Sequence, residues 1–256
     1  MRSFLKELRK RNERIYWFGW YNLVLGIACL ILMQFDSQKI LGISRWIKPM
    51  KFSFSFGIMV WTMGWLLFYL DNKKKVKTIS LLIIITLFIE SFLITMQSVR
   101  GVPSHFNIAD SFNAMVFNVM GIAIVVFTST AVYAEWLFFK QKRFSIQASY
   151  LWGIRLGLFF FIVFSLEAGF MLSRLSHTVG GADGGPGLPL INWSTEHGDL
   201  RVAHFLGIHS LQLLPLAGYY FFRRPGSIVL FSTFYFLLVT TILILALRGL
   251  PLGSFS

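Results

Sequence analysis

Apolar residues in this chain run in seven long blocks separated by short polar segments. The blocks are Ile15–Phe35, Phe52–Leu70, Ile79–Met96, Phe112–Tyr133, Leu151–Leu172, Val202–Phe222 and Ile228–Leu247. A helix that crosses a bilayer needs about 17–25 predominantly apolar residues, and each block falls in that range. Backbone polar groups in lipid must be bonded within their own segment, which makes the blocks helices. The pattern predicts an all-α polytopic membrane protein with seven transmembrane helices in one domain, residues 1–256.

The segments between the blocks differ in character. Residues 1–14 form a basic N-terminal segment, and the loops "DNKKKVK" and "RRPGS" are short and basic. The longest connection, residues 173–201, joins the fifth and sixth blocks and holds five glycines between Gly180 and Gly187, with Pro186 and Pro189. A loop of this length is usually a lid, a binding loop or a disordered segment, so we expect an irregular structure there.

The distribution of basic residues along the chain predicts its orientation in the membrane. The net charge of +13 would fit a nucleic-acid-binding protein, but only 14% of the residues are charged and 55% are hydrophobic. Sixteen of the 24 Lys and Arg residues lie on the side of the N-terminus and eight on the other, in alternating loops. This asymmetry predicts a cytoplasmic N-terminus and an outer C-terminus. The expected partner of the basic segments is the lipid bilayer, and we exclude nucleic acid.

Four polar side chains interrupt the apolar blocks at a similar depth. Counted from the outer ends of their helices at about 1.5 Å per residue, Glu90, Asn118, Glu167 and His209 lie roughly 8–10 Å below the surface. Polar groups in hydrocarbon are costly and usually functional. We therefore expect one polar cavity that opens to the outer side beneath the glycine-rich loop. Cys29, the single cysteine, lies within the first block, so intrachain disulfides and thiolate clusters are excluded.

The segment "GDLRVAHFLGIHSLQLLPL" carries two histidines in one predicted span. Five residues place His204 and His209 about 140° apart around a helix, so a regular helix cannot present both to one ion. His204 shares a face with Arg201, and His209 shares a face with Gln212. We expect the two histidines to serve different purposes.

Three motifs carry a resemblance. "RWIKPMKF", "RGVPSHFN" and "GDLRVAHFLGIH" together resemble a family of seven-helix bacterial integral membrane proteins with no known activity. The resemblance spans most of the chain. It implies the seven-helix fold and a multi-pass location in the bacterial cytoplasmic (inner) membrane, and it implies no activity.

The first functional hypothesis is a metal- or haem-binding membrane redox protein. The proposed metal ligands are His105, His204 and His209, since imidazole suits iron, copper, zinc and haem. The chemistry would involve Glu90, Glu167 and His209. The cofactor, a metal ion or a single haem b, would contact polar and basic residues, namely Lys51, Arg100, Asn118, Arg174, Arg201 and Gln212.

Two other classes stay open. An intramembrane hydrolase or transferase acting on a lipid would resemble the ceramidase and progestin-receptor-like proteins, whose paired histidines are spaced i,i+4 on the last helix, whereas here they are i,i+5 on the sixth. A proton-linked carrier or small-ligand sensor would use Glu90, Glu167 and His209 as a relay. In each class a lipid, quinone or other small ligand would enter from the outer side. A purely structural alternative pairs the two glutamates with Arg174 and Arg100 and leaves His177 and His197 solvated.

Overall fold

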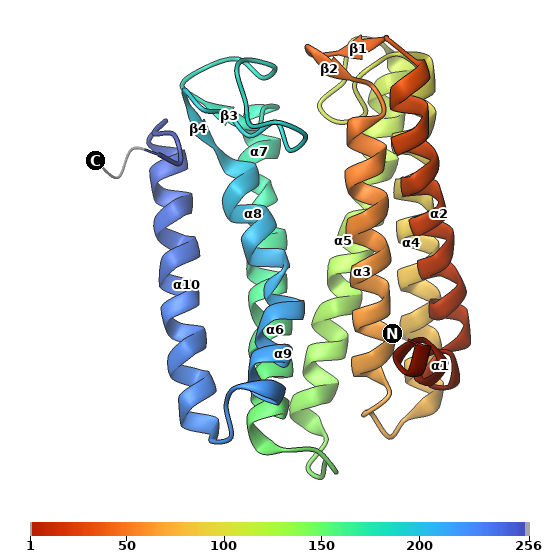
Figure 1. Ribbon diagram of the computed structural model, residues 1–256, viewed down its shortest axis with the longest axis vertical. Coiled ribbons are helices and arrows are strands. Elements are labelled where there is room, and N and C mark those ends of the chain that lie inside the picture. The colour runs from red at the N-terminus through yellow and green to blue at the C-terminus, as the bar shows by residue number, and fades with distance from the viewer. Residues whose placement is uncertain (1, 254–256) are drawn as a thin grey trace. The chain divides into compact units, whose positions relative to one another are not determined.

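The computed structural model describes residues 2–253, and these are mostly helical (Figure 1). The elements in chain order are α1 (Arg2–Arg11), α2 (Glu13–Phe35), β1 (Lys39–Ile40), β2 (Ile43–Ser44), α3 (Ile47–Leu67), α4 (Lys73–Arg100), α5 (Ser111–Lys140), α6 (Ala148–Leu166), α7 (Ala168–Arg174), β3 (Thr178–Val179), β4 (Gly198–Asp199), α8 (Leu200–Ile208), α9 (Ser210–Tyr220) and α10 (Pro225–Leu247).

Six helical segments within residues 2–253 are long and apolar enough to cross a membrane. They are Glu13–Phe35, Ile47–Leu67, Lys73–Arg100, Ser111–Lys140, Ala148–Arg174 and Pro225–Leu247. The chain is therefore a multi-pass membrane protein, as its apolar blocks predict. The remaining predicted span, Val202–Phe222, falls on α8 and α9, which are separated at His209. Seven crossings and their orientation stay a prediction.

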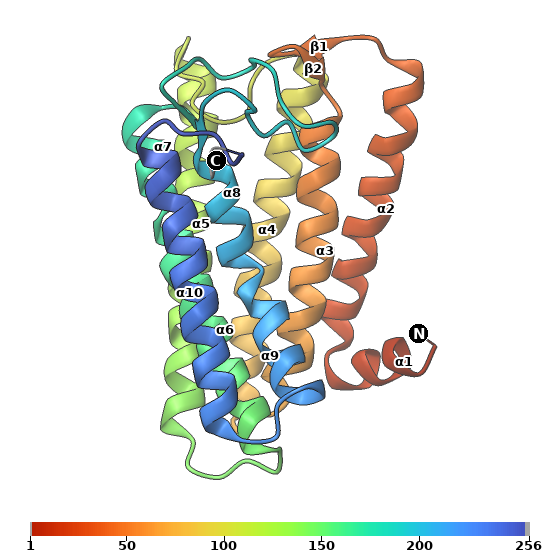
Figure 2. The same ribbon diagram turned by 60° about the vertical axis from the view of Figure 1, so that its left-hand side comes forward.

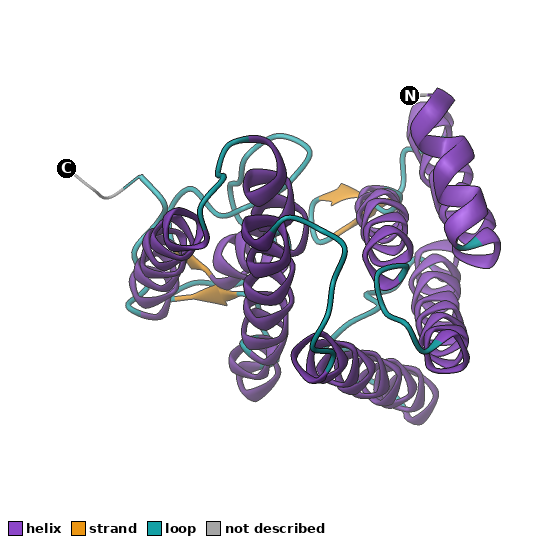
Figure 3. Ribbon diagram, turned by 90° about the horizontal axis from the view of Figure 1, so that it is seen from below, coloured by secondary structure: helices purple, strands orange, loops and turns teal. Residues whose placement is uncertain are grey.

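The chain divides into two compact units, Met1–Leu137 and Phe138–Ser256, called here the N-terminal and C-terminal units. In the N-terminal unit α2, α3 and α4 run side by side, and α1 crosses their end (Figures 1 and 2). In the C-terminal unit α6 packs against α8, α9 and α10. Figure 3 shows these helices end-on.

Close packing in the N-terminal unit depends on glycine. A Cβ at Gly19 of α2 would lie 1.9 Å from the indole nitrogen of Trp61 on α3. That nitrogen donates a hydrogen bond to the carbonyl of Tyr16 over 3.1 Å. The absence of a side chain at Gly19 thus lets a large aromatic ring of α3 reach the backbone of α2 and satisfy its own donor.

Glycine also brings α6 and α9 into backbone contact in the C-terminal unit. A Cβ at Gly153 would lie 2.4 Å from the carbonyl oxygen of Leu214, and one at Gly157 would lie 2.9 Å from that of Ser210. The Ser210 hydroxyl donates to the Gly157 carbonyl over 3.0 Å. At the far end the Ser149 hydroxyl donates to the carbonyl of Gly218 over 2.9 Å. Small residues at every fourth position with interhelical hydrogen bonds are typical of helix pairs in membranes.

The connection from α7 to α8 contains two short paired segments. Strand β3 pairs antiparallel with β4, placing Thr178 opposite Asp199. A further antiparallel bridge joins Gly187 to Ser194. The backbone turns through positive φ angles at Leu175, Gly180, Gly184, Leu190 and Asn192, conformations that glycine and asparagine tolerate best.

Candidate functional site

Two ionisable residues stand at the points where helices of the C-terminal unit are interrupted. Glu167 ends α6 and begins α7, and His209 ends α8 and begins α9. Pro215 lies inside α9, and a proline leaves the carbonyl four residues earlier without its usual donor. Both interruptions are local: the backbone of Glu167 and His209 keeps helical angles, and their amides still donate to the carbonyls of Val163 and Phe205 over 3.1 Å.

Glu167 is held by a histidine from the neighbouring helix. Its Oε2 lies 3.2 Å from Nδ1 of His204 on α8, and the same nitrogen lies 2.8 Å from the carbonyl oxygen of Phe164 on α6. The carboxyl side chain is 3% exposed, whereas the imidazole is 28% exposed. The other carboxyl oxygen, Oε1, is buried without a hydrogen-bond partner among the described residues. The carboxyl can therefore accept a further hydrogen bond or a proton.

Only one of the two ring nitrogens of His209 has a hydrogen-bond partner among the described residues. Its Nδ1 lies 3.0 Å from Oε1 of Gln212, as the shared helix face predicts. Since an amide oxygen only accepts, Nδ1 carries the proton and Nε2 has the lone pair. Nε2 is buried and has no hydrogen-bond partner in the part of the chain that is described. The imidazole lies 4.3 Å from the ring of Phe205, which in turn lies 5.5 Å from that of Trp193.

An ion pair fixes the start of α8. Asp199 caps the helix by accepting from the backbone of Arg201 over 3.0 Å, and its carboxylate also accepts from the Arg201 guanidinium over 2.9 and 2.6 Å. The backbone of Ser194 donates to Asp199 over 2.7 Å, and Arg201 donates to the carbonyl of Asn192. Arg201, expected to contact a cofactor, is thus engaged in holding the loop onto the helix.

A second carboxylate organises the loop after α7. Asp183 accepts from the His177 ring over 2.7 Å, from the Ser176 hydroxyl over 3.0 Å and from the backbone of Thr178 over 2.9 Å. Partial burial raises the pKa of Asp183, but the hydrogen bonds and charge of His177 outweigh it and hold this pKa far below its usual value. The helix α7 ends at Arg174, so His177 lies in the loop that follows it, where it contacts Asp183.

In the N-terminal unit the C-terminal end of α4 carries a network of polar side chains. Gln97 donates to Oδ1 of Asn113 over 2.8 Å, and Arg100 donates to both residues over 2.6 and 2.9 Å. Asn113 also bonds Asp110. Two turns deeper, Glu90 is 1% exposed, and neither of its carboxyl oxygens has a hydrogen-bond partner among the described residues. The positive charge of Lys48 acts on Glu90.

The other candidate residues have separate surroundings. His105 contacts Ser104 over 3.1 Å and lies among the rings of Phe52, Phe106 and Phe117. Three further candidates have simpler environments: Lys51 is half-buried on α3, Asn118 is exposed on α5, and Arg174 is exposed and donates to the Phe170 carbonyl over 3.2 Å.

Within residues 2–253, no group of three or more His, Cys, Asp or Glu side chains is placed to hold a metal ion. Glu90 and Asn118 belong to the N-terminal unit, whereas Glu167 and His209 belong to the C-terminal unit. The single polar layer that would join these four residues therefore stays a prediction. What the structure brings together is smaller: Glu167 with His204, and His209 with Gln212.

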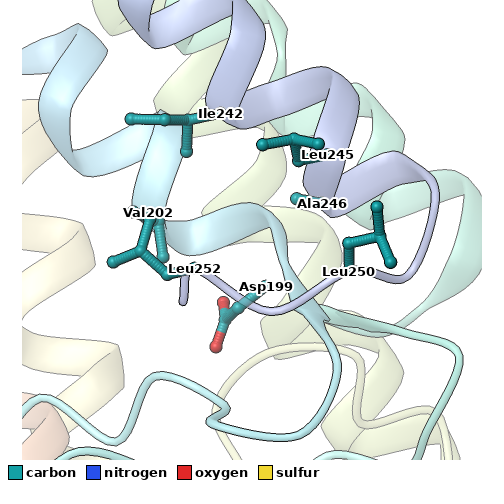
Figure 4. A pocket seen from close by; sticks show the side chains of 7 residues that line it. All are labelled: Asp199, Val202, Ile242, Leu245, Ala246, Leu250 and Leu252. Carbon is teal, nitrogen blue, oxygen red and sulfur yellow. The ribbon is translucent and has the colours of Figure 1, made fainter. Parts of the chain in front are cut away.

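A small cavity lies beside Asp199, bounded by α8, α10 and the chain after α10 (Figure 4). Apart from Asp199 its lining is apolar, consisting of Val202, Ile242, Leu245, Ala246, Leu250 and Leu252. Its volume is about 10 Å³, which is at the lower limit for one water molecule. This cavity is too small for an organic ligand.

Sequence reasoning missed the residues that hold the site in place. Asp199 follows a glycine and precedes an apolar run, which is a helix-capping signal that was available in the sequence. Asp183 had no such signal, because its partners are fixed by the folded loop rather than by spacing. No protein-family model, curated protein or solved structure matches this chain. Inference about function therefore starts from the geometry of the two units.

Proposed function

We propose that this membrane protein binds a proton together with a small polar ligand at the interrupted helices of its C-terminal unit, as a proton-linked carrier or a small-ligand sensor does. One observation carries the proposal. Glu167 and His209 occupy the two interruptions, and each has a buried polar atom without a hydrogen-bond partner among the described residues. Such atoms cost free energy unless a ligand or proton satisfies them.

The pairing of Glu167 with His204 supports the proton in this proposal. A carboxyl group and an imidazole in contact share protons, and imidazole titrates near pH 6.5 in water. Protonation of Glu167 would weaken its contact with His204 and turn the carboxyl into a donor. The two residues belong to different helices, so a change in their contact acts on how the end of α6 is joined to α8.

A tryptophan provides the experiment. Trp193 contacts Phe205, which contacts His209, so its emission reports on that imidazole. The protein in lipid nanodiscs is titrated between about pH 5 and 9, around the usual pKa of imidazole, and the spectrum of Trp193→Phe is subtracted. We expect a sigmoidal transition that His209→Asn abolishes and that Glu167→Gln displaces. His105→Asn, the same substitution in the other unit, should leave it unchanged.

A flat difference spectrum, or a transition that survives His209→Asn, contradicts the proposal. Carrier and sensor are separated by reconstitution into liposomes that contain a pH-sensitive dye. A carrier supports proton movement when its co-substrate is present, whereas a sensor titrates without any flux.

A metal or haem site is the second candidate, and His209 favours it. A metal-binding histidine typically has one nitrogen held by a hydrogen bond and the other bare, as Gln212 and the buried Nε2 provide here. Protein purified in mild detergent would then hold a metal in near-stoichiometric amount or show a Soret band, and His209→Ala would reduce either signal. A folded preparation without metal or haem would end this candidate.

The seven-crossing topology belongs to the same proposal. The interrupted pair α8 and α9 would form the sixth crossing, which places the C-terminus on the outer side of a bacterial cytoplasmic membrane. An alkaline phosphatase reporter fused after Ser256 should then be active. Activity of a cytoplasmic reporter at the same position would instead show an even number of crossings.

A further inference from the structure

The corner between α1 and α2 forms a basic hollow of about 480 Å³. It is lined by Lys6, Arg9 and Lys10, which share one face of α1, and by Glu13 at the start of α2. This basic hollow lies in the N-terminal unit and is independent of the interrupted helices.

The corner is held firmly by its opposite face. Leu8 is fully buried. Arg11 lies over the ring of Trp65 on α3, at 3.8 Å, and its Nε bonds Glu7 over 3.0 Å. Asn12 caps α2 and donates to the Ser80 hydroxyl of α4 over 2.7 Å. Three helices thus fix the direction of α1, and the lysines of the basic hollow are presented on a rigid support.

The charge in the basic hollow is positive. Arg9 is paired with Glu13 over 2.9 Å, and both side chains are more than half exposed. Lys6 and Lys10 are exposed, and neither forms an ion pair with any of the described residues. The two ammonium groups therefore leave the basic hollow with a net positive charge, because Glu13 is neutralised by Arg9.

The position of α1 indicates where that anion comes from. Figures 2 and 3 show α1 lying across the end of the spanning helices rather than along them. Trp17 is 54% exposed one turn into α2, and the Arg9 guanidinium lies 5.4 Å from its ring. Exposed tryptophan beside basic residues at the end of a span is typical of the headgroup region.

We propose that the basic hollow binds the phosphate of an anionic phospholipid through Lys6 and Lys10, with Arg9 held beside it by Glu13. The acyl chains would run along the exposed apolar face of α2, where Tyr21 and Val24 are 38% and 60% exposed. A lipid satisfies both features at once, because its phosphate meets the lysines and its chains cover apolar surface that a soluble phosphate would leave in place.

Native mass spectrometry of the full chain from mild detergent tests the proposal. Phosphatidylglycerol and phosphatidylcholine are titrated against wild type and against Lys6→Gln/Lys10→Gln. The matched control is Lys74→Gln/Lys77→Gln, which removes two exposed lysines at the start of α4 in the same unit. Each lysine near a membrane surface contributes to anion binding. Losing two lysines should therefore raise the dissociation constant of the most tightly bound phosphatidylglycerol molecule about thirtyfold. The control variant should change this dissociation constant less than threefold, which is below the effect expected for one such lysine.

Three outcomes would overturn the proposal. Equal losses in both double variants would show that the lipid follows net charge only. Equal affinity for the two lipids in the wild type would show that the phosphate diester alone, without net lipid charge, is sufficient. Displacement of phosphatidylglycerol by an equimolar amount of soluble glycerol 3-phosphate would assign the basic hollow to a soluble phosphate. All of the variants change exposed side chains, and circular dichroism checks that each retains its helices.

Discussion

Nδ1 of His204 lies 3.2 Å from Oε2 of Glu167 and 2.8 Å from the carbonyl oxygen of Phe164, so one imidazole bridges α8 to the end of α6. Nδ1 carries a single hydrogen, and the shorter distance assigns it mainly to the carbonyl. The contact joins two helices exactly where one of them is interrupted, which makes it the first target for mutation.

A double-mutant cycle measures this contact. His204→Ala leaves the buried carboxyl of Glu167 without a partner and should lower the free energy of unfolding by about 1–3 kcal/mol. In the Glu167→Gln background the same change should cost less, with a coupling of about 0.5–3 kcal/mol. Unfolding in detergent is followed by circular dichroism. Thr233→Ala on the exposed side of α10 serves as the reference, and additive effects in the main cycle would contradict the contact.

Replacing a glycine at the α6–α9 contact should lower the free energy of unfolding. Gly153→Ala would drive a Cβ to 2.4 Å from the carbonyl oxygen of Leu214, and overpacking of this kind costs about 1–3 kcal/mol. Gly169→Ala on α7 is the matched control, since no atom lies within 4 Å of its Cβ position. Alanine there should be neutral or stabilise the helix by up to about 1 kcal/mol. Thermal unfolding compares the two, and equal effects would contradict backbone contact.

The buried carboxyl of Glu90 should reduce stability. A group that is 1% exposed, with neither oxygen hydrogen-bonded to a described residue, has lost its hydration without compensation. Glu90→Gln replaces the ionisable carboxyl with a neutral amide of the same shape, and we expect it to raise the free energy of unfolding by about 1 kcal/mol. Gln97→Leu is the contrasting change, because Gln97 donates to Asn113 and its loss should destabilise. Destabilisation by Glu90→Gln would mean that Lys48 compensates the charge.

The loop after α7 should become less stable at low pH. The pKa of Asp183 is lowered in the folded protein, so its contribution to stability is complete above the unfolded pKa of about 3.9. That contribution declines as the pH falls below this value toward the folded pKa. Hydrogen exchange at the Thr178 amide, which donates to Asp183, should lose protection below about pH 4. In Asp183→Asn the protection should be lower and independent of pH over this range, and a pH-dependent Asn variant would assign the effect elsewhere.

The sequence predicted the membrane class well because hydrocarbon imposes one simple rule on every spanning segment. It also placed Gln212 beside His209, since three residues on a helix share a face. It could not foresee that His204 would reach Glu167, because that contact depends on how α8 lies against α6. The role of His177 was missed for a related reason: helical spacing ceases to apply after Leu175, where the backbone turns left-handed.

The backbone contact between α6 and α9 also has an evolutionary consequence. Ser149, Gly153 and Gly157 recur at four-residue intervals on α6, and they meet Ser210, Leu214 and Gly218 at the same intervals on α9. A larger residue at any of the glycines would push the helices apart, so selection on this protein must act on size there before it acts on chemistry. Divergent descendants would keep small residues at Ser149, Gly153 and Gly157 of α6 and at Ser210 and Gly218 of α9, where Leu214 meets Gly153 through its backbone, after their loops and even His209 had changed. These small residues, rather than the histidines, are the feature by which distant relatives of this chain would be recognised.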